Sequence, residues 1–117
     1  MRKYNNEITT IDGIKFASRL EAERFQQLRL LEKAEEIEAL QLQVEFQILT
    51  GWTNPDTGER TRSKYYVADF VYYDKQSGKW IIEDTKGVET SDFKLKWDFM
   101  KTLYRDFEFR KVTRKDI

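Results

Sequence analysis

Two neighbouring segments of the sequence constrain the fold most strongly. Residues 64–73 read KYYVADFVYY, residues 79–86 read KWIIEDTK, and a DKQSG turn separates these two predicted β-strands. By strand alternation, the side chains that share a face in the first segment are Val67 with Val71 and Ala68 with Phe70. Because apolar side chains leave both faces, the two segments predict central strands that helices or a second subunit cover on both sides.

Two helices and two further strands surround this central pair. Ser18 and Glu21 have the S-x-x-E spacing of a capping box, which predicts the start of a helix. The predicted elements are, in order, a hairpin over residues 8–16, a helix over 19–33 with a turn or second short helix through Leu40, a strand over 43–49, a loop over 51–63, the central pair, a helix from near Thr90 and a strand over 107–112. This order predicts an α/β fold (α+β in some schemes) with a mixed central sheet flanked by helices and its last two strands parallel. The length of 117 residues fits one domain over 1–117.

The residue types that are missing limit the possible chemistry. The chain has no histidine and no cysteine, which excludes histidine general bases, cysteine nucleophiles, disulfides and the usual zinc sites. Any catalysis must therefore use carboxylates, lysine, arginine, tyrosine or hydroxyl groups. The sequence also lacks the apolar run of a signal peptide and any stretch near the roughly 20 apolar residues of a membrane span. We therefore expect a cytoplasmic protein without a membrane partner.

The charged residues are balanced in number but unevenly distributed. The chain has 21 basic and 21 acidic residues, a balance that by itself indicates no nucleic-acid partner. From Lys94 to Lys115, however, eight basic residues occur with only three acidic ones. Such a basic end can bind a phosphate backbone, and a solvated charged surface explains it equally well.

The central pair of strands carries a cluster of charged residues. Asp84 and Lys86 lie two apart on one strand and therefore share a face. A four-residue turn between the strands would place Asp69 opposite Asp84, and a two-residue turn would place it opposite Lys86. Facing carboxylates repel each other, and a divalent cation such as Mg²⁺ would remove that repulsion. An ion pair between Lys86 and either acid is the structural alternative, and the residues alone leave both open.

These residues also resemble a nuclease signature. Asp69, followed after fourteen residues by DTKG over residues 84–87, resembles the motif of the PD-(D/E)XK nuclease superfamily. The segments GIKFASRLEAERF, LQLQVEF, YVADFVYY, IIEDTKG and TSDFKLKWDF are similar to a family of small phage-encoded nucleases, over nearly the whole chain. The proline that often precedes the first acid of the motif is replaced by Ala68. The resemblance implies a restriction-endonuclease-like fold with an αβββαβ core.

The resemblance further implies roles for individual residues. Asp69 and Asp84 would bind Mg²⁺, or Mn²⁺ in its place, with the Thr85 carbonyl as a further ligand. Lys86 would orient or help deprotonate the attacking water and stabilise charge on the phosphate. Glu21 would complete or extend the metal site.

Several polar residues have a structural alternative to their implied role. Glu21 could instead satisfy the Ser18 amide as the second half of the capping box. Gln43 falls at a position that recurs in the small phage family, and it could equally be a polar residue at a strand edge. Glu83 faces away from Asp84, so we expect it to be structural. The basic residues that would contact DNA, or else form a solvated surface, are Arg60, Arg62, Lys64, Lys94 and Lys96.

The resemblance thus predicts a Mg²⁺-dependent endodeoxyribonuclease that acts in the recombination, replication or packaging of phage DNA within the host cytoplasm. Branched or junction DNA is among its candidate substrates. Its partners would be DNA and, in a symmetric homodimer, a second copy that lets two sites cut two strands. The alternatives are a non-catalytic DNA- or protein-binding module on the same fold and a structural oligomer whose charges form ion pairs.

Overall fold

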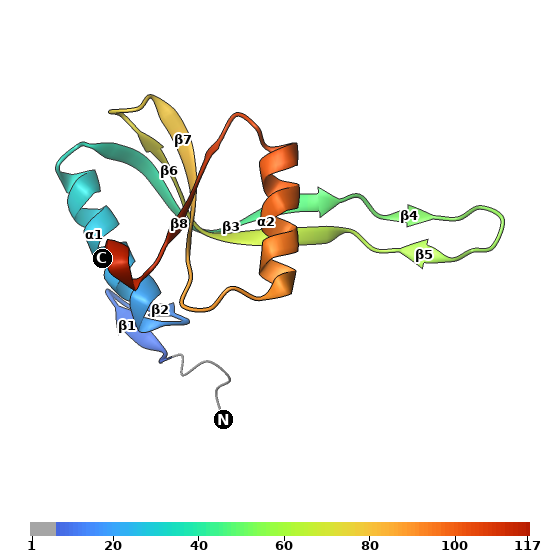
Figure 1. Ribbon diagram of the computed structural model, residues 1–117, viewed down its shortest axis with the longest axis horizontal. Helices are drawn as coiled ribbons and strands as arrows, with labels where there is room; N and C mark the ends of the chain where they lie inside the picture. Colours follow the sequence, from blue (N-terminus) through green and yellow to red (C-terminus); the bar gives the residue numbers. More distant parts are fainter. Residues whose placement is uncertain (1–6) are drawn as a thin grey trace.

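The described part of the protein, residues 7–117 of the computed structural model, combines helices with a mixed β-sheet. The elements are β1 (Thr9–Ile11), β2 (Ile14–Phe16), α1 (Arg19–Lys33), β3 (Ile37–Leu49), β4 (Trp52–Thr53), β5 (Arg60–Thr61), β6 (Lys64–Asp74), β7 (Lys79–Thr85), α2 (Ser91–Leu103), β8 (Glu108–Val112) and a short 3₁₀ turn, η1 (Arg114–Asp116). The main sheet has the strand order β3-β6-β7-β8, with α1 and α2 packed on opposite sides (Figure 1). The predicted α+β fold with a mixed sheet and two helices is confirmed.

The register of the central strands is that of the longer predicted turn. β6 and β7 are antiparallel, and Asp74 pairs with Lys79. The alternative two-residue turn is therefore wrong. β7 and β8 are parallel, with Ile82 opposite Phe109, as the crossover through α2 predicts. No helix within residues 7–117 is both long enough and apolar enough to cross a membrane.

A hairpin and a cap fix the start of α1. Asp12 and Gly13 both have positive φ, at 52° and 79°, which is the backbone of the predicted two-residue hairpin turn. Ser18 Oγ accepts a hydrogen bond from the Glu21 backbone N–H at 3.1 Å, so the predicted N-cap is confirmed. The Glu21 carboxylate accepts a hydrogen bond from Gln43 on β3. Glu21 thereby links the first turn of α1 to the main sheet through a side-chain hydrogen bond.

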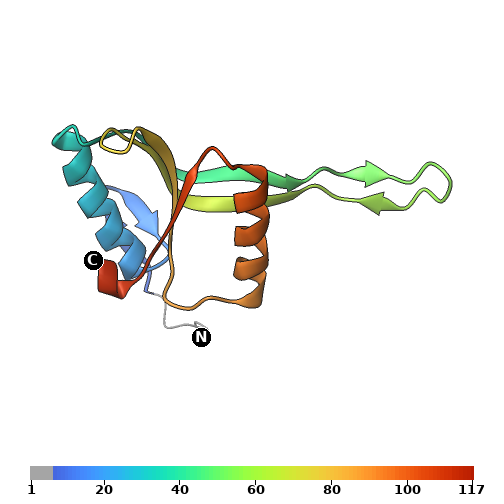
Figure 2. The same cartoon turned by 45° about the horizontal axis from the view of Figure 1, so that its top comes forward.

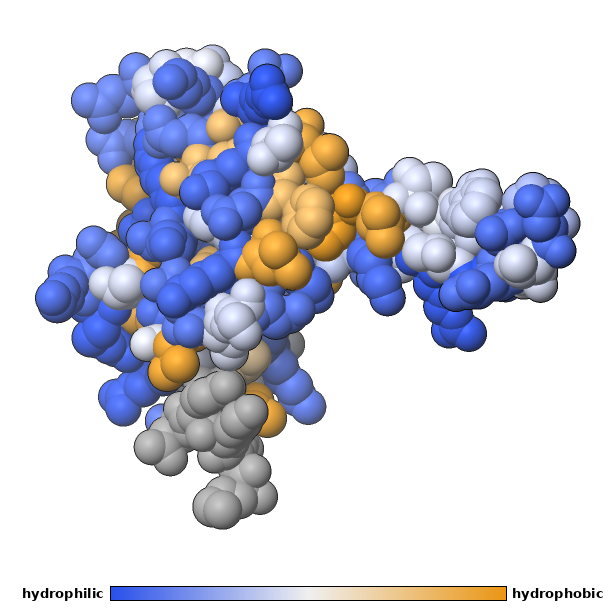
Figure 3. All heavy atoms as spheres, turned by 45° about the vertical axis from the view of Figure 1, so that its right-hand side comes forward, coloured by the Kyte–Doolittle hydropathy of each residue, from blue (hydrophilic) through white to orange (hydrophobic). Residues whose placement is uncertain are grey.

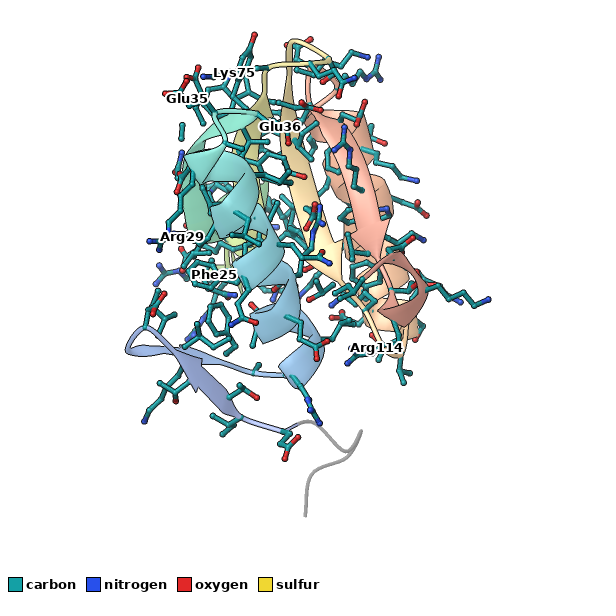
Figure 4. The ribbon with its side chains drawn as sticks, turned by 90° about the vertical axis from the view of Figure 1, so that its left-hand side faces the viewer. Phe25, Arg29, Glu35, Glu36, Lys75 and Arg114 are labelled. Carbon is teal, nitrogen blue, oxygen red and sulfur yellow. The ribbon has the colours of Figure 1, made fainter. Side chains whose placement is uncertain are left out.

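The buried face of α1 builds the first of two hydrophobic cores. Arg29 lies on the rim of this core, with its guanidinium carbon 5.5 Å from the centre of the Phe25 ring (Figure 4). The buried members of this core are Phe16, Ala22, Phe25, Leu28, Ile37, Phe70, Tyr72 and Ile81. The second core lies under α2 and contains Tyr66, Ala68, Val71, Ile82, Phe93, Trp97 and Met100. Each helix therefore covers one face of the same sheet.

The strand after α1 is longer than the sequence predicts. β3 begins at Ile37, so the prediction of a second short helix through Leu40 is wrong, and a tight turn alone joins α1 to β3. Glu35 has a φ of 61°, which ends the helical backbone, and Glu36 O accepts a hydrogen bond from Lys75 N at 3.1 Å (Figure 4). Ala39 also has positive φ, at 57°. This irregular backbone interrupts the alternation that identifies a strand from its sequence.

The segment predicted as a loop over residues 51–63 instead forms a two-stranded arm. β4 and β5 pair antiparallel and project from the body of the protein (Figures 1 and 2). Asn54 Oδ1 accepts a hydrogen bond from Asp56 N at 2.9 Å at the tip, and Gly58 supplies a positive φ of 76°. A Cβ at Gly51 would lie 3.0 Å from Thr61 O, so a larger residue would be crowded where the arm joins the sheet. Strands of two residues are too short to show alternation.

Strand β6 changes faces at Asp69. Ala68 and Val71 both pack under α2, whereas Phe70 packs under α1, so the predicted pairing of Ala68 with Phe70 on one face is wrong. The β6–β7 pairing described begins at Phe70, and Gln43 on β3 has a φ of 51° beside this point. The two central strands separate here. Beyond the separation, only the α2 side of β6 is covered, and Tyr65 and Val67 are exposed on the other side.

Candidate active site

The predicted acids gather where β6 separates from β7. A cavity of about 260 Å³ opens there between the start of α1 and the start of α2. Glu21 from α1, Asp69 from β6 and Thr85 from β7 line it, together with Lys86 and Phe93. Asp84 lies behind this wall with 2 % of its surface exposed. The β6–β7 hairpin and the distant helix α1 thus bring carboxyl groups and one amine to one place.

Asp84 is a buried acid with three polar neighbours. Tyr66 Oη donates a hydrogen bond to Asp84 Oδ2 at 2.5 Å, and Lys86 Nζ lies 3.3 Å from the same oxygen. Burial, and then the hydrogen bond and negative charge of Asp69, raise the pKa of Asp84 from 3.8 to about 8, although Lys86 and Tyr66 lower it. Asp84 therefore binds a proton more readily than an ordinary aspartate, and a proton held there is shared with Asp69 through their hydrogen bond, whereas the charged form has an ion pair with Lys86.

The backbone and side chain of Thr85 hold Asp69 in position. Asp69 Oδ2 accepts hydrogen bonds from Thr85 N at 2.9 Å and from Thr85 Oγ1 at 2.8 Å. The other oxygen, Oδ1, is 3.4 Å from Gln43 Nε2. Asp69 therefore bridges the three strands β3, β6 and β7 at the point where the sheet splits.

Glu21 contacts the sheet side of the cavity. It is 4 % exposed, and Gln43 Nε2 donates a hydrogen bond to its Oε1 at 2.7 Å. Burial, followed by the charge and hydrogen bond of Asp69, raises the pKa of Glu21 from 4.5 to about 7, while hydrogen bonds from the Ala17 backbone and from Gln43 lower it. The Glu21 carboxyl group therefore interacts both with the backbone at the start of α1 and with residues of the sheet.

Lys86 sits between an acid and an aromatic ring. Its ammonium group lies 4.3 Å from the centre of the Phe93 ring, and its backbone N–H donates to Val112 O at 2.9 Å. The side chain remains 27 % exposed and lines the cavity. Lys86 can therefore face a molecule in the cavity while Asp84 and Phe93 keep its position fixed.

The donor atoms around the cavity suit a hard cation, but they are not assembled around one point. The acids supply only oxygen donors, which Mg²⁺ and Mn²⁺ prefer. Within residues 7–117, no three histidine, cysteine, aspartate or glutamate side chains converge as a ready metal site. The acids meet in pairs: Glu21 interacts with Asp69, and Asp69 with Asp84. A cation bound here would replace the proton that the second pair shares.

Glu83 occupies a separate and fully paired site on the other face of β7. Arg24 donates two hydrogen bonds to its carboxylate, at 2.7 and 2.9 Å, and Tyr72 Oη donates a third at 2.6 Å. Burial by itself lowers the pKa of Arg24, but the hydrogen bonds and charge of Glu83, together with Tyr72, outweigh that effect, and the pKa ends above its ordinary value. The predicted structural role of Glu83 therefore matches its contacts.

The predicted DNA contacts lie apart from the acids. Arg60 and Arg62 are on the arm and Lys64 begins β6, whereas Lys94 and Lys96 are on α2. None of the five lines the cavity that contains Glu21 and Asp69. The sequence alone does not determine the role of Gln43. In the structure, Gln43 donates hydrogen bonds to both Glu21 and Asp69. Strand alternation gave no signal for this contact because the positive φ of Gln43 turns its side chain out of the alternating pattern.

Comparison with known proteins places the whole chain in one family. Neither the curated proteins nor the solved structures gave a match. A protein-family model, described as "Protein of unknown function (DUF1064)", matches residues 1–116. The chain therefore belongs to the DUF1064 family.

Proposed function

We propose that this protein is a divalent-cation-dependent endonuclease of the PD-(D/E)XK type that hydrolyses phosphodiester bonds in DNA. The observation that carries the proposal is the pair formed by the buried Asp84 and the half-buried Asp69, which lies beside Lys86 at an open cavity. Two neighbouring carboxyl groups repel each other and cost the fold free energy, and a cation that binds both would remove that cost.

The order of the elements supports the same assignment. The main body runs α1, β3, β6, β7, α2 and β8, which is the αβββαβ order of the restriction-endonuclease-like core. Asp69 lies on the second of these strands, and Asp84 is followed by Lys86 at the end of the third. These are the positions that the superfamily motif assigns to its acids and lysine.

Asp69, Asp84 and the Thr85 carbonyl are the groups that would hold Mg²⁺ or Mn²⁺, with Glu21 extending the site. Such a cation would supply positive charge for the phosphate and lower the pKa of a bound water. Tyr66 orients Asp84 through its hydrogen bond, and Thr85 orients Asp69 through two more. The protein thus fixes both carboxyl groups before any substrate arrives.

Lys86 is the group that would act on the substrate directly. Its ammonium faces the cavity and can donate to a phosphate oxygen or to the attacking water. The Asp84 carboxyl and the Phe93 ring limit its motion, which reduces the entropy lost when the substrate binds. The positive charge of Lys86 also attracts the anionic phosphodiester to the cavity.

A panel of DNA substrates tests the proposal. Linear, nicked, flap and four-way-junction DNA are incubated with the protein and with Mg²⁺, Mn²⁺ or EDTA. We expect cleavage of at least one substrate that requires the cation and disappears in Lys86→Ala purified in parallel, which controls for contaminating nucleases. Equal cleavage by both proteins, or none by either on any substrate, would overturn the proposal.

A non-catalytic DNA- or protein-binding module on the same fold is the second candidate. It is favoured by the burial of Asp84 and by the pairwise arrangement of the acids within residues 7–117, which do not form a preassembled metal site. Calorimetry with Mn²⁺ separates the two candidates. The nuclease assignment requires cation binding that Asp84→Asn removes, whereas the module requires none.

A further inference from the structure

The arm formed by β4 and β5 has no role in the cavity chemistry described above. It stands clear of the body as a two-stranded projection (Figure 3), and its two strands share no side chain with the two cores. Every residue from Pro55 to Arg62 is exposed. An arm that buries so little of itself contributes little to the stability of the fold. Its contacts are therefore to be sought outside the chain.

One face of the arm is basic. Arg60, Arg62 and Lys64 alternate along the chain, so in an extended segment their side chains leave the same face. Arg60 pairs with Thr53 and Lys64 with Leu49, so no acid lies directly opposite these two cations. None of the three basic residues forms an ion pair within the part of the chain that the structure describes. These charges are free to meet an anionic partner.

The opposite face of the arm carries an exposed tryptophan. Trp52 pairs with Thr61, on the face that alternates with Arg60, and it is 59 % exposed. The acidic residues of the arm, Asp56 and Glu59, are at its tip and on the Trp52 side of the alternation. The arm thus has a basic face, which can bind negatively charged groups, and an aromatic face, which can pack against flat apolar groups. A polyanion that also contains flat apolar groups can contact both faces.

The dimensions select duplex nucleic acid among such polyanions. A two-stranded ribbon fits the major groove of B-DNA, which is about 12 Å wide. The five residues from Arg60 to Lys64 span roughly 13 Å when extended, so cations at both ends can reach phosphates on the two rims of the groove. Resting on the proposed action on DNA, we propose that the arm inserts into the major groove of duplex DNA and holds the substrate at a distance from the cleaved bond.

This proposal predicts a dependence on duplex length. The longest extent of the protein is 56 Å, and the arm forms one end of it (Figure 1). At 3.4 Å per base pair, about 16 base pairs match that extent. A duplex of about 30 base pairs is longer than the whole protein and can therefore occupy both the arm and the cavity, whereas one of about 8 base pairs covers about half of that extent, and we expect it to occupy only one of them. The arm matters for the longer substrate alone.

The test compares an arm variant with a matched control variant. The arm variant is Arg60→Gln/Arg62→Gln/Lys64→Gln, and the control, Lys33→Gln/Lys75→Gln/Lys79→Gln, removes the same charge from exposed positions at the other end of the body. Binding to duplexes of both lengths and to single strands is measured by fluorescence anisotropy in EDTA over a range of salt. We expect the arm variant to bind the long duplex at least about tenfold more weakly, with a salt slope smaller by about 2 to 3.

The remaining comparisons define what would overturn the proposal. Trp52→Ala should weaken duplex binding without changing the salt slope, because tryptophan contacts no phosphate through charge. Unchanged long-duplex binding by the arm variant, an equal loss on single strands, or a change only in oligomeric state by light scattering would each overturn the role in groove binding. A wild-type protein that binds the long duplex through its arm but cleaves no DNA would instead refute the proposed nuclease and leave the arm in place.

Discussion

Glu83 and Asp84 are neighbours in the sequence, and both are almost fully buried, yet their surroundings differ completely. Glu83 receives two hydrogen bonds from Arg24 and one from Tyr72, so a cation inside the protein balances its charge. Asp84 faces another acid, Asp69, and its pKa is raised to about 8. Glu83 faces an arginine and no second acid, whereas the one lysine beside Asp84, Lys86, has to balance the effect of both Asp69 and burial.

The difference shows how burial alone fails to identify a functional acid. A buried acid that has its own arginine contributes to the packing of the sheet against α1. A buried acid that lacks one, beside a second acid and an open cavity, is costly for the fold. A bound cation would reduce the electrostatic cost of burying Asp84 beside a second acid, and it would bring no such gain at Glu83. The proposed metal site is therefore on the Asp84 side of β7.

The largest effect is expected when the same chemical change is made on the two faces of β7. Glu83→Gln leaves the Arg24 guanidinium buried without its charge partner, and we expect it to cost roughly 3–5 kcal/mol of unfolding free energy. Asp84→Asn keeps the hydrogen bond from Tyr66 and lets the new amide donate to Asp69 as the shared proton does. We expect its stability at pH 8 without cation to equal or exceed that of the wild type. Chemical denaturation measures both, and equal destabilisation by the two variants would remove the distinction between the faces.

The next effect concerns Lys86, the cation on the Asp84 side. Lys86→Ala removes an electrostatic donor from the cavity, and we expect cleavage to fall by about 10²–10³ in rate, or roughly 3–4 kcal/mol in barrier. DNA binding and the melting temperature should change little, because Lys86 is partly exposed. Lys75→Ala, which changes an exposed lysine at the far end of the sheet, serves as the matched control. Near wild-type turnover by Lys86→Ala would show that this lysine has no catalytic role.

The pH dependence of stability gives a third comparison between the faces. The pKa values of Asp84 and Glu21 rise to about 8 and about 7 in the folded protein, above their values in the unfolded chain. The folded state therefore binds more protons than the unfolded state between about pH 4 and pH 8, so stability falls as the pH rises through this window. We expect a loss of at least about 2 kcal/mol between pH 5 and pH 8.5 without cation.

Added Mn²⁺ should restore much of this loss at pH 8.5, because it replaces the shared proton. The control is Asp84→Asn, in which both the pH dependence and the Mn²⁺ effect should shrink. Thermal melts over this range of pH check the expectation. A stability that rises from pH 5 to pH 8.5 would contradict the shifted pKa values.

The smallest effect separates the two roles of Glu21. Glu21→Gln keeps the shape of the side chain and can still accept a hydrogen bond from Gln43, but it removes the charge. If Glu21 extends the metal site, activity falls at least about tenfold, which corresponds to ~1.4 kcal/mol in barrier, while the melting temperature hardly moves. A purely structural contact would leave Mg²⁺-dependent cleavage intact. We expect the loss of activity, because Asp69 affects the pKa of the Glu21 carboxyl group more strongly than the hydrogen bond from the helix N-terminus does.

Much of the fold follows from local rules that the sequence displays directly. The caps at Ser18 and Thr90 mark the starts of α1 and α2, and the Asp12-Gly13 turn marks the first hairpin. The DKQSG turn limits the register of β6 with β7 to two alternatives, and the structure has the one that pairs Asp74 with Lys79. Each of these signals depends on residues close together in the chain, which is why the sequence alone could predict them.

The irregular parts of the sheet could not be predicted in this way. β3 contains positive φ angles at Ala39 and Gln43, and β6 changes faces at Asp69, so strand alternation gives the wrong face for Ala68 relative to Phe70. The sequence predicts a loop at the arm because the paired strands are only two residues long. These features arise from backbone conformations that short polar or flexible segments can adopt without a recognisable pattern in the sequence.

The sequence by itself determined which chemical groups this protein has to work with. Without histidine or cysteine it offers carboxylates, and the DTKG segment after an apolar strand placed Asp84 and Lys86 on one face. Only the tertiary structure decided which buried acid is neutralised, because Arg24 and Gln43 reach Glu83 and Asp69 from elements far away in the chain. The free energy of a buried charge depends on the charged and polar groups that folding places next to it. Strand alternation shows which face a side chain is on, but it does not show which groups from other elements lie beside it.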